Sequence, residues 1–115
     1  MIYFNVSLED LAHEVPKQAA AALRNHADTL PAGRERSVVM DTARAFLKLA
    51  RAAKKGARGA AVWPAVRAVN IACCGMDWQE RRNLVEVPLE TCCRLLDCPA
   101  PGTLGVLKMR KAVRV

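Results

Sequence analysis

Aromatic residues are scarce in this sequence, since only five of its 115 residues carry a Phe, Trp or Tyr ring, namely Tyr3, Phe4, Phe46, Trp63 and Trp78. The core must therefore be built mainly from aliphatic residues, Met and Cys. Alanine is abundant instead, with 20 residues, and it is the best helix former because it loses no side-chain entropy on folding. The composition predicts packed helices rather than a sheet.

Long apolar runs are also missing, because none reaches the roughly 18 residues that a membrane-spanning helix needs. Residues 1–10 show neither a basic start nor a long apolar stretch, so we expect no secretory signal. The number of cysteines is odd, which argues against a secreted disulfide framework. A reduced, cytoplasmic location without membrane contact is therefore expected.

The cysteines do not show the spacing of a zinc site. Two adjacent pairs and a single residue occur, whereas zinc knuckles place two thiolates two to four residues apart. Neighbouring cysteines on a helix point about 100° apart, so they chelate poorly. The five cysteines are Cys73, Cys74, Cys92, Cys93 and Cys98. We expect Cys73 and Cys93 to be small core residues and Cys98 to be the exposed thiol.

Catalytic motifs are absent as well. The sequence has no nucleophile elbow, no zinc-protease motif, no P-loop and no dinucleotide fingerprint. Its two histidines, His13 and His26, stand in no triad or ligand spacing. We therefore expect no enzyme, no catalytic or metal-binding residues and no cofactor.

The spacing of apolar residues predicts a mainly α, single-domain bundle over residues 1–115. Because Pro16 lacks an N–H group, we expect two helices there, at 8–14 and 16–27. Further helices are predicted at 34–55, 63–74 and 89–97, with a short one after the capping box at 77–80. Pro88 should end that short helix and can also open the next one. Residues 2–6 are β-prone, and 103–115 can form a last helix or a strand paired with them. The helix at 34–55, about 33 Å long, should be capped by Gly56 and would be the long central element of the bundle.

That long helix also carries the candidate protein interface. Its apolar face is broader than the rest of a small domain can easily cover, which suggests pairing with a second copy or with a groove on a target. The residues expected in this interface are Val39, Met40, Ala43, Phe46, Leu47 and Ala50.

Acidic residues are missing from two segments of this chain of net charge +7. Residues 42–76 contain seven basic side chains and no acidic one. Residues 98–115 contain four basic side chains and no acidic one. A basic stripe can lie along phosphates or steer association with an acidic protein surface, although it can also be a solvated helix face. The candidate contacts are Arg44, Lys48, Arg51, Lys54, Lys55 and Arg58.

Residues 89–111 resemble the helix-turn-helix of sigma-factor region 4. A helical stretch from Leu89 leads into a Pro- and Gly-containing turn, then Gly102-Thr103 opens a segment with Lys108, Arg110 and Lys111. The resemblance implies DNA binding through residues 103–115. The turn contains an extra proline, and apolar residues replace polar base-reading side chains at 105–107.

Together these features predict a small, non-enzymatic regulator of the bacterial or phage-encoded inhibitor type. It would act by binding another protein, such as a transcription factor, and would form a homodimer through the long helix. The alternative is a DNA- or RNA-binding regulator that uses the basic block at 44–67 and the C-terminal segment.

Overall fold

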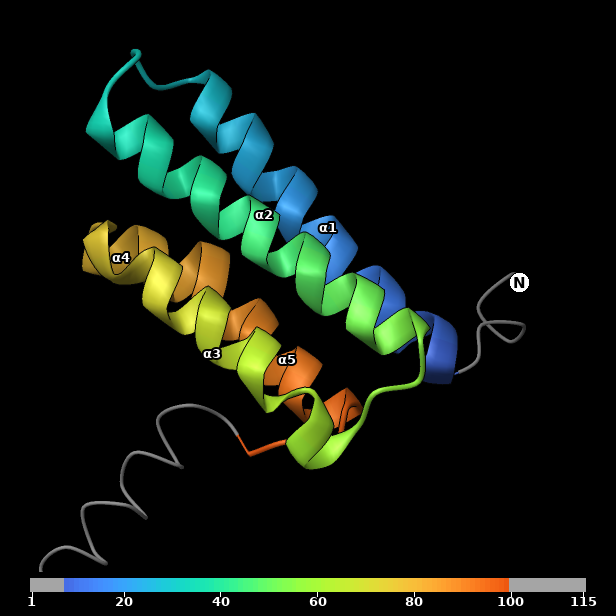
Figure 1. Cartoon of the computed structure of the whole chain (residues 1–115). Helices are drawn as coiled ribbons and strands as arrows, with labels where there is room; N and C mark the ends of the chain where they lie inside the picture. Colours follow the sequence, from blue (N-terminus) through green and yellow to red (C-terminus); the bar gives the residue numbers. More distant parts are fainter. Residues whose placement is uncertain (1–7, 100–115) are drawn as a thin grey trace, which may run out of the picture.

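The computed structural model describes residues 8–99, which form four antiparallel helical rods (Figure 1). The first three rods are α1 (Leu8–Asp28), α2 (Arg34–Lys54) and α3 (Trp63–Ala72). The fourth runs through α4 (Trp78–Arg81), the π-helical turn η4 (Arg82–Glu86) and α5 (Val87–Leu95). Short 3₁₀ turns, η2 (Gly59–Ala61) and η3 (Cys73–Gly75), flank α3. The described residues contain no strand, so the prediction of a mainly α bundle is confirmed.

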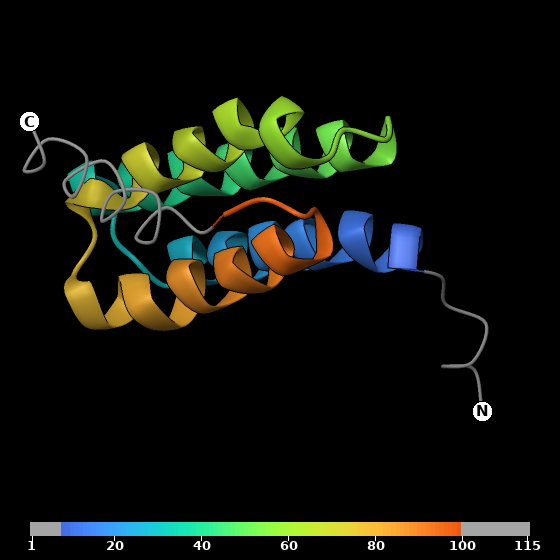
Figure 2. The same ribbon diagram turned by 90° about the horizontal axis from the view of Figure 1, so that it is seen from below.

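The bundle has no single long central helix, and that part of the prediction was wrong. Helices α1 and α2 both span 21 residues and pack against each other as an antiparallel hairpin. Helix α3 then packs on α2, and α5 packs on α1, as both views show (Figures 1 and 2). The alternative strand pair of residues 2–6 and 103–115, like the alternative last helix, lies outside the described residues.

Helix α1 continues through Pro16, so the predicted break into two helices was wrong. A proline inside a helix removes one hydrogen bond and crowds the carbonyl four residues earlier. Packing outweighs this cost, because the ring of Pro16 lies on the buried face of α1. Ala12, Pro16, Leu23 and Ala27 are all buried and follow one another at helical spacing.

The fourth rod likewise continues through Pro88, where we expected a helix end. Asp77 caps its start, since the carboxylate accepts hydrogen bonds from the N–H groups of Gln79 at 3.2 Å and Glu80 at 3.4 Å. The π-helical turn lies directly before Pro88, which sits in the first turn of α5 and cannot donate to the helix. The wider turn lets the rod accommodate the proline without ending.

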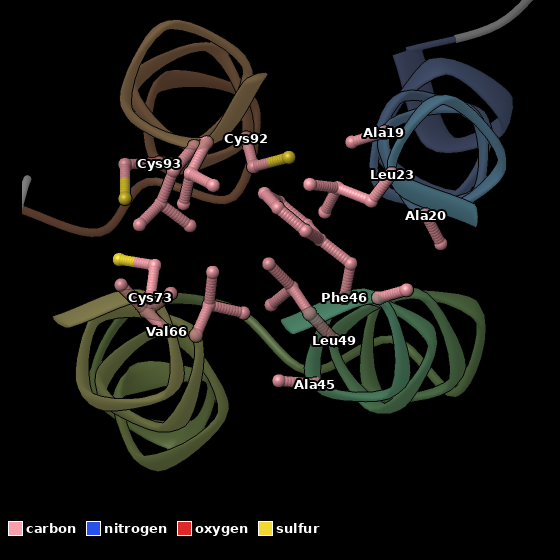
Figure 3. Close-up of a cluster of buried hydrophobic side chains, with 14 of the residues drawn as sticks. Ala19, Ala20, Leu23, Ala45, Phe46, Leu49, Val66, Cys73, Cys92 and Cys93 are labelled. Carbon is pink, nitrogen blue, oxygen red and sulfur yellow. The ribbon is translucent and has the colours of Figure 1, made fainter. Parts of the chain in front are cut away.

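Phe46 occupies the centre of the core and is the one aromatic ring among the fully buried side chains of the described residues. It projects from α2 between the rods, toward Leu23 of α1 and Cys92 of α5 (Figure 3). Alanines also lie between the rods: Ala20 of α1 points toward α2, Ala19 points toward α5, and Ala45 of α2 points toward α3 (Figure 3). Small side chains thus fill much of the space between the packed helices.

Two helix ends adopt the same hydrogen-bonded motif. After α2, the N–H of Gly56 donates to the Ala53 carbonyl and that of Ala57 donates to the Ala52 carbonyl, both at 3.0 Å. This is the Schellman pattern, and Gly56 has the left-handed conformation that it requires, with φ +93°. The predicted cap at Gly56 is confirmed. The end of α5 repeats the pattern with Asp97 in the left-handed position, at φ +55°.

Candidate functional site

The predicted protein interface on α2 lies mostly inside the molecule. Val39, Ala43, Phe46 and Ala50 are at most 2% exposed and pack within the chain's own core. Only Met40 and Leu47 keep part of their surface open to solvent. A partner protein could reach this stripe only by opening the bundle, so a docking surface on the folded chain has to be sought elsewhere. The broad apolar face of α2 is covered by α1 and α3, whose contribution the sequence did not reveal.

An apolar groove of about 510 Å³ runs between α1 and the fourth rod. On α1 it is lined by Leu11, Val15, Ala19 and Ala22, and on the opposite wall by Leu84, Val87 and Pro88. We call this surface the α1/α5 groove. Leu11 and Val87 are 38% and 45% exposed, although both are large apolar side chains. The groove therefore leaves apolar surface in contact with water, which is costly unless a partner covers it.

The groove results from a second apolar stripe on α1. Leu11, Val15 and Ala22 lie beside the buried stripe that contains Ala12 and Leu23, so α1 is apolar over more than the face that the bundle covers. The antiparallel packing of α1 and α5 brings this stripe next to Val87. Glu14 is the one charged side chain in the lining, so the groove is predominantly apolar.

The basic residues form a second candidate surface, on the outward face of α2. Lys48, Arg51 and Lys55 line a shallow hollow of about 520 Å³ beside the turn at Gly56. Within residues 8–99 neither these three nor the neighbouring Lys54 makes an ion pair. Their positive charge is thus available to an anionic partner. We call these four residues the basic face of α2.

Two of the predicted basic contacts have structural partners instead. The guanidinium of Arg44 donates to the Asp41 carboxylate at 2.9 Å, one turn earlier on α2. That of Arg58 donates to the carbonyls of Ala53 at 3.2 Å and Ala57 at 2.7 Å. The Ala53 carbonyl thus accepts from Arg58 as well as from the Gly56 N–H, and the Ala57 carbonyl lies in the turn that follows α2.

The cysteines lie mainly in the core. Cys73, Cys92, Cys93 and Cys98 are buried and Cys74 is exposed, so the expectation that Cys98 is the exposed thiol was wrong. Burial raises the pKa of Cys73 to about 11 and the pKa values of Cys92 and Cys93 to about 12. At neutral pH these three thiols are protonated and weakly nucleophilic.

The two histidines make separate contacts between helices. The Nδ1 atom of His13 lies 3.1 Å from the Ala50 carbonyl oxygen, which links α1 to α2. The Nε2 atom of His26 lies 3.4 Å from a carboxylate oxygen of Glu80. Among residues 8–99, no three His, Cys, Asp or Glu side chains gather in a way that could hold a metal ion.

The described helices include none that is long and apolar enough to cross a membrane. The segment that resembles the sigma-factor helix-turn-helix begins with α5, and its turn and basic part, from residue 100 onward, lie outside the described residues. Comparison with known proteins gives no match: no protein family fits the sequence, and neither a curated protein nor a solved structure is significantly similar.

Proposed function

We propose that this protein is a non-enzymatic regulator that binds an amphipathic helix of another protein in the α1/α5 groove. The observation that carries this proposal is the exposure of Leu11 and Val87 on the two walls of one apolar groove. A protein whose helix is held there would be sequestered or inhibited, as a transcription factor is by an anti-activator.

The size of the groove favours a single helix over a second copy of the whole domain. From Leu11 to Ala22 the groove follows α1 for about 17 Å, which is roughly three helical turns. Eleven residues line it, whereas a stable interface between two proteins uses roughly 20–30 residues on each side. Helices bind such grooves through apolar side chains spaced three and four residues apart.

A photo-crosslinking experiment tests the groove directly. A benzophenone amino acid would replace Val87 in the native host, and Ile71 would be the control because it is an equally apolar residue, 59% exposed on α3. After nuclease treatment, we expect position 87 to crosslink to one helical segment of one protein and position 71 not to do so. Equal crosslinking from both positions, or crosslinking of position 87 to a second copy alone, would contradict the proposal.

A synthetic peptide of the crosslinked segment then measures the contribution of the groove. A charge at Val87 has no partner in an apolar groove, so Val87→Glu should weaken peptide binding by at least tenfold, equivalent to about 1.4 kcal/mol. Ile71→Glu adds the same charge outside the groove and should leave the affinity unchanged. Both positions are exposed, so neither substitution should unfold the bundle.

The basic face of α2 supports nucleic-acid binding as a second candidate function. Its four cations have no acidic partner in residues 8–99, and three of them surround one hollow. Phosphate contacts of this kind make binding fall steeply with salt concentration. We propose that in this case Lys48, Arg51 and Lys55 contact the phosphate backbone without reading its sequence.

Fluorescence anisotropy with a labelled duplex, measured over a salt series, tests the second function. The triple variant Lys48→Gln, Arg51→Gln, Lys55→Gln should lower the slope of log affinity against log salt by about three. Arg44→Gln is the matched control, because Arg44 is already paired with Asp41 on the same helix. An unchanged slope in the triple variant would exclude the basic face as the phosphate contact.

A further inference from the structure

Cys93 and Cys98 lie at the two ends of the Schellman motif that closes α5. The N–H of Cys98 donates to the Cys93 carbonyl at 2.9 Å, and Asp97 between them has the left-handed conformation. In a Schellman motif, this hydrogen bond joins the residues whose side chains meet across the helix end. A hydrophobic contact between these two positions frequently accompanies the motif, whereas here both residues carry thiols.

The two thiols also influence each other electrostatically, since Cys98 helps to raise the pKa of the Cys93 thiol. The pair is almost enclosed, with 1% and 7% of the residues exposed, and the Cys98 thiol donates to the Pro99 carbonyl at 3.5 Å. A disulfide needs α-carbons roughly 4.4–6.8 Å apart. A six-residue turn closed by its terminal hydrogen bond keeps its ends within such a range.

The other cysteines are placed less favourably for this reaction. Cys92 points away from Cys93, toward Ala19 and Leu23 of α1, as the close-up shows (Figure 3). Cys73 faces the core from the end of α3, and its thiol donates to the Asn70 carbonyl at 3.3 Å. Cys74 is exposed and donates to the same carbonyl.

We propose that Cys93 and Cys98 form a dithiol site, which a small-molecule disulfide such as oxidised glutathione converts into an intramolecular disulfide. The Cys98 thiolate attacks one glutathione sulfur, so that a mixed disulfide forms and one glutathione thiolate leaves. The Cys93 thiolate then attacks the Cys98 sulfur and releases the second glutathione thiolate. The two cysteines are oxidised, one glutathione disulfide is reduced to two thiols, and the two protons pass through solvent to the leaving thiolates.

The environment assigns the order of these steps. Cys98 is the more exposed of the two residues, at 7% against 1%. Burial raises the pKa of its thiol, and the neighbouring Cys93 thiol offsets part of that rise. Burial raises the pKa of Cys93 to about 12, so this thiol is a poor first nucleophile. The reaction should therefore be slow at neutral pH and accelerate as the pH rises.

The new bond would fix the end of α5 where it meets the turn before α3. The N–H of Gly59 donates to the Leu96 carbonyl at 2.8 Å, within the six residues that the disulfide would close. The basic segment 100–115 begins two residues after Cys98. Oxidation would thus constrain the backbone of residues 93–98, directly before that segment in the sequence.

Peptide mapping of the oxidised full chain tests the proposal. Trypsin cuts after Arg94, between the two cysteines, so a Cys93–Cys98 disulfide joins two peptides that otherwise separate. After oxidation with glutathione disulfide and blocking of free thiols, we expect these joined peptides, with fragment spectra placing the bond on Cys93 rather than Cys92. Their yield should be unaffected by Cys74→Ser. A bond from Cys93 to Cys73, or a stable glutathione adduct on Cys98, would overturn the proposal.

A second probe measures the proximity of the thiols without oxidation. Phenylarsine oxide binds stably only where two thiols can coordinate one arsenic atom, so the reduced chain should retain one arsenic group. Cys98→Ser and Cys98→Ala should each lose it, and Cys74→Ser should retain it. Retention of arsenic by both Cys98 variants would place the dithiol elsewhere and refute the assignment.

Discussion

Replacing Phe46 by alanine should cost the bundle a large part of its stability. The ring is fully buried between α1, α2 and α5 and is the largest fully buried side chain of the described residues. Truncating such a ring removes its transfer free energy and leaves a cavity, and together these effects cost about 3–5 kcal/mol in other protein cores. A domain of this size typically has about 5–15 kcal/mol in total. Phe46→Leu, which keeps most of the volume, should cost about 1.5 kcal/mol or less.

Urea unfolding followed by far-UV circular dichroism, at low and high protein concentration, measures this loss and locates the ring. If Phe46 packs within one chain, the loss should be the same at both concentrations. If Phe46 instead packs against a second chain, as the sequence suggested, the wild-type unfolding midpoint should rise with concentration and the variant should lose that dependence. A loss below about 1 kcal/mol would also refute the central position of Phe46 in the core.

Three further changes test local features of the fold by the same urea assay. Asp97→Gly should stabilise the bundle by about 0.5–1 kcal/mol, because glycine adopts the left-handed conformation without strain, whereas Asp97→Ala should not. Asp77→Ala should cost about 1 kcal/mol, since it removes the acceptor for two N–H groups at the start of α4. Because burial raises the pKa of Cys92 from 9.0 to about 12, the folded state keeps a proton that the unfolded state loses. Stability should therefore fall as the pH rises above 9, and Cys92→Ala should reduce that fall by about 1.4 kcal/mol per pH unit.

The parts of the fold that the sequence predicts well are those determined by local chemistry. The helix at 34–55 was expected from its apolar spacing, and its end from Gly56, where the left-handed conformation favours glycine. The start of α4 was expected from Asp77, whose side chain can reach N–H groups only a few residues away. Such features depend on neighbours in the sequence, so a single chain is enough to reveal them.

The two prolines mark where local reasoning fails. Pro16 and Pro88 each interrupt helical hydrogen bonding, and local chemistry therefore predicts a helix end at both. In the structure Pro16 is buried in the interface of α1 with its neighbours, and a π-helical turn precedes Pro88. Packing between segments distant in the sequence compensates for the missing hydrogen bonds, and the local sequence does not show that packing.

The expected helix end before Pro16 also concealed the α1/α5 groove. A helix that ended before Pro16 would separate Leu11 and Val15 from Ala19 and Ala22, and the four would form no common stripe. Because α1 continues through Pro16, the four residues line one wall, and the continuous fourth rod provides Val87 on the other. The apolar residues that the sequence assigned to an interface on α2 are instead the core that holds these walls in place. The α1/α5 groove thus depends on two helical rods that each accommodate a proline. The basic face of α2 depends only on helical spacing. The sequence therefore revealed the basic face but not the groove.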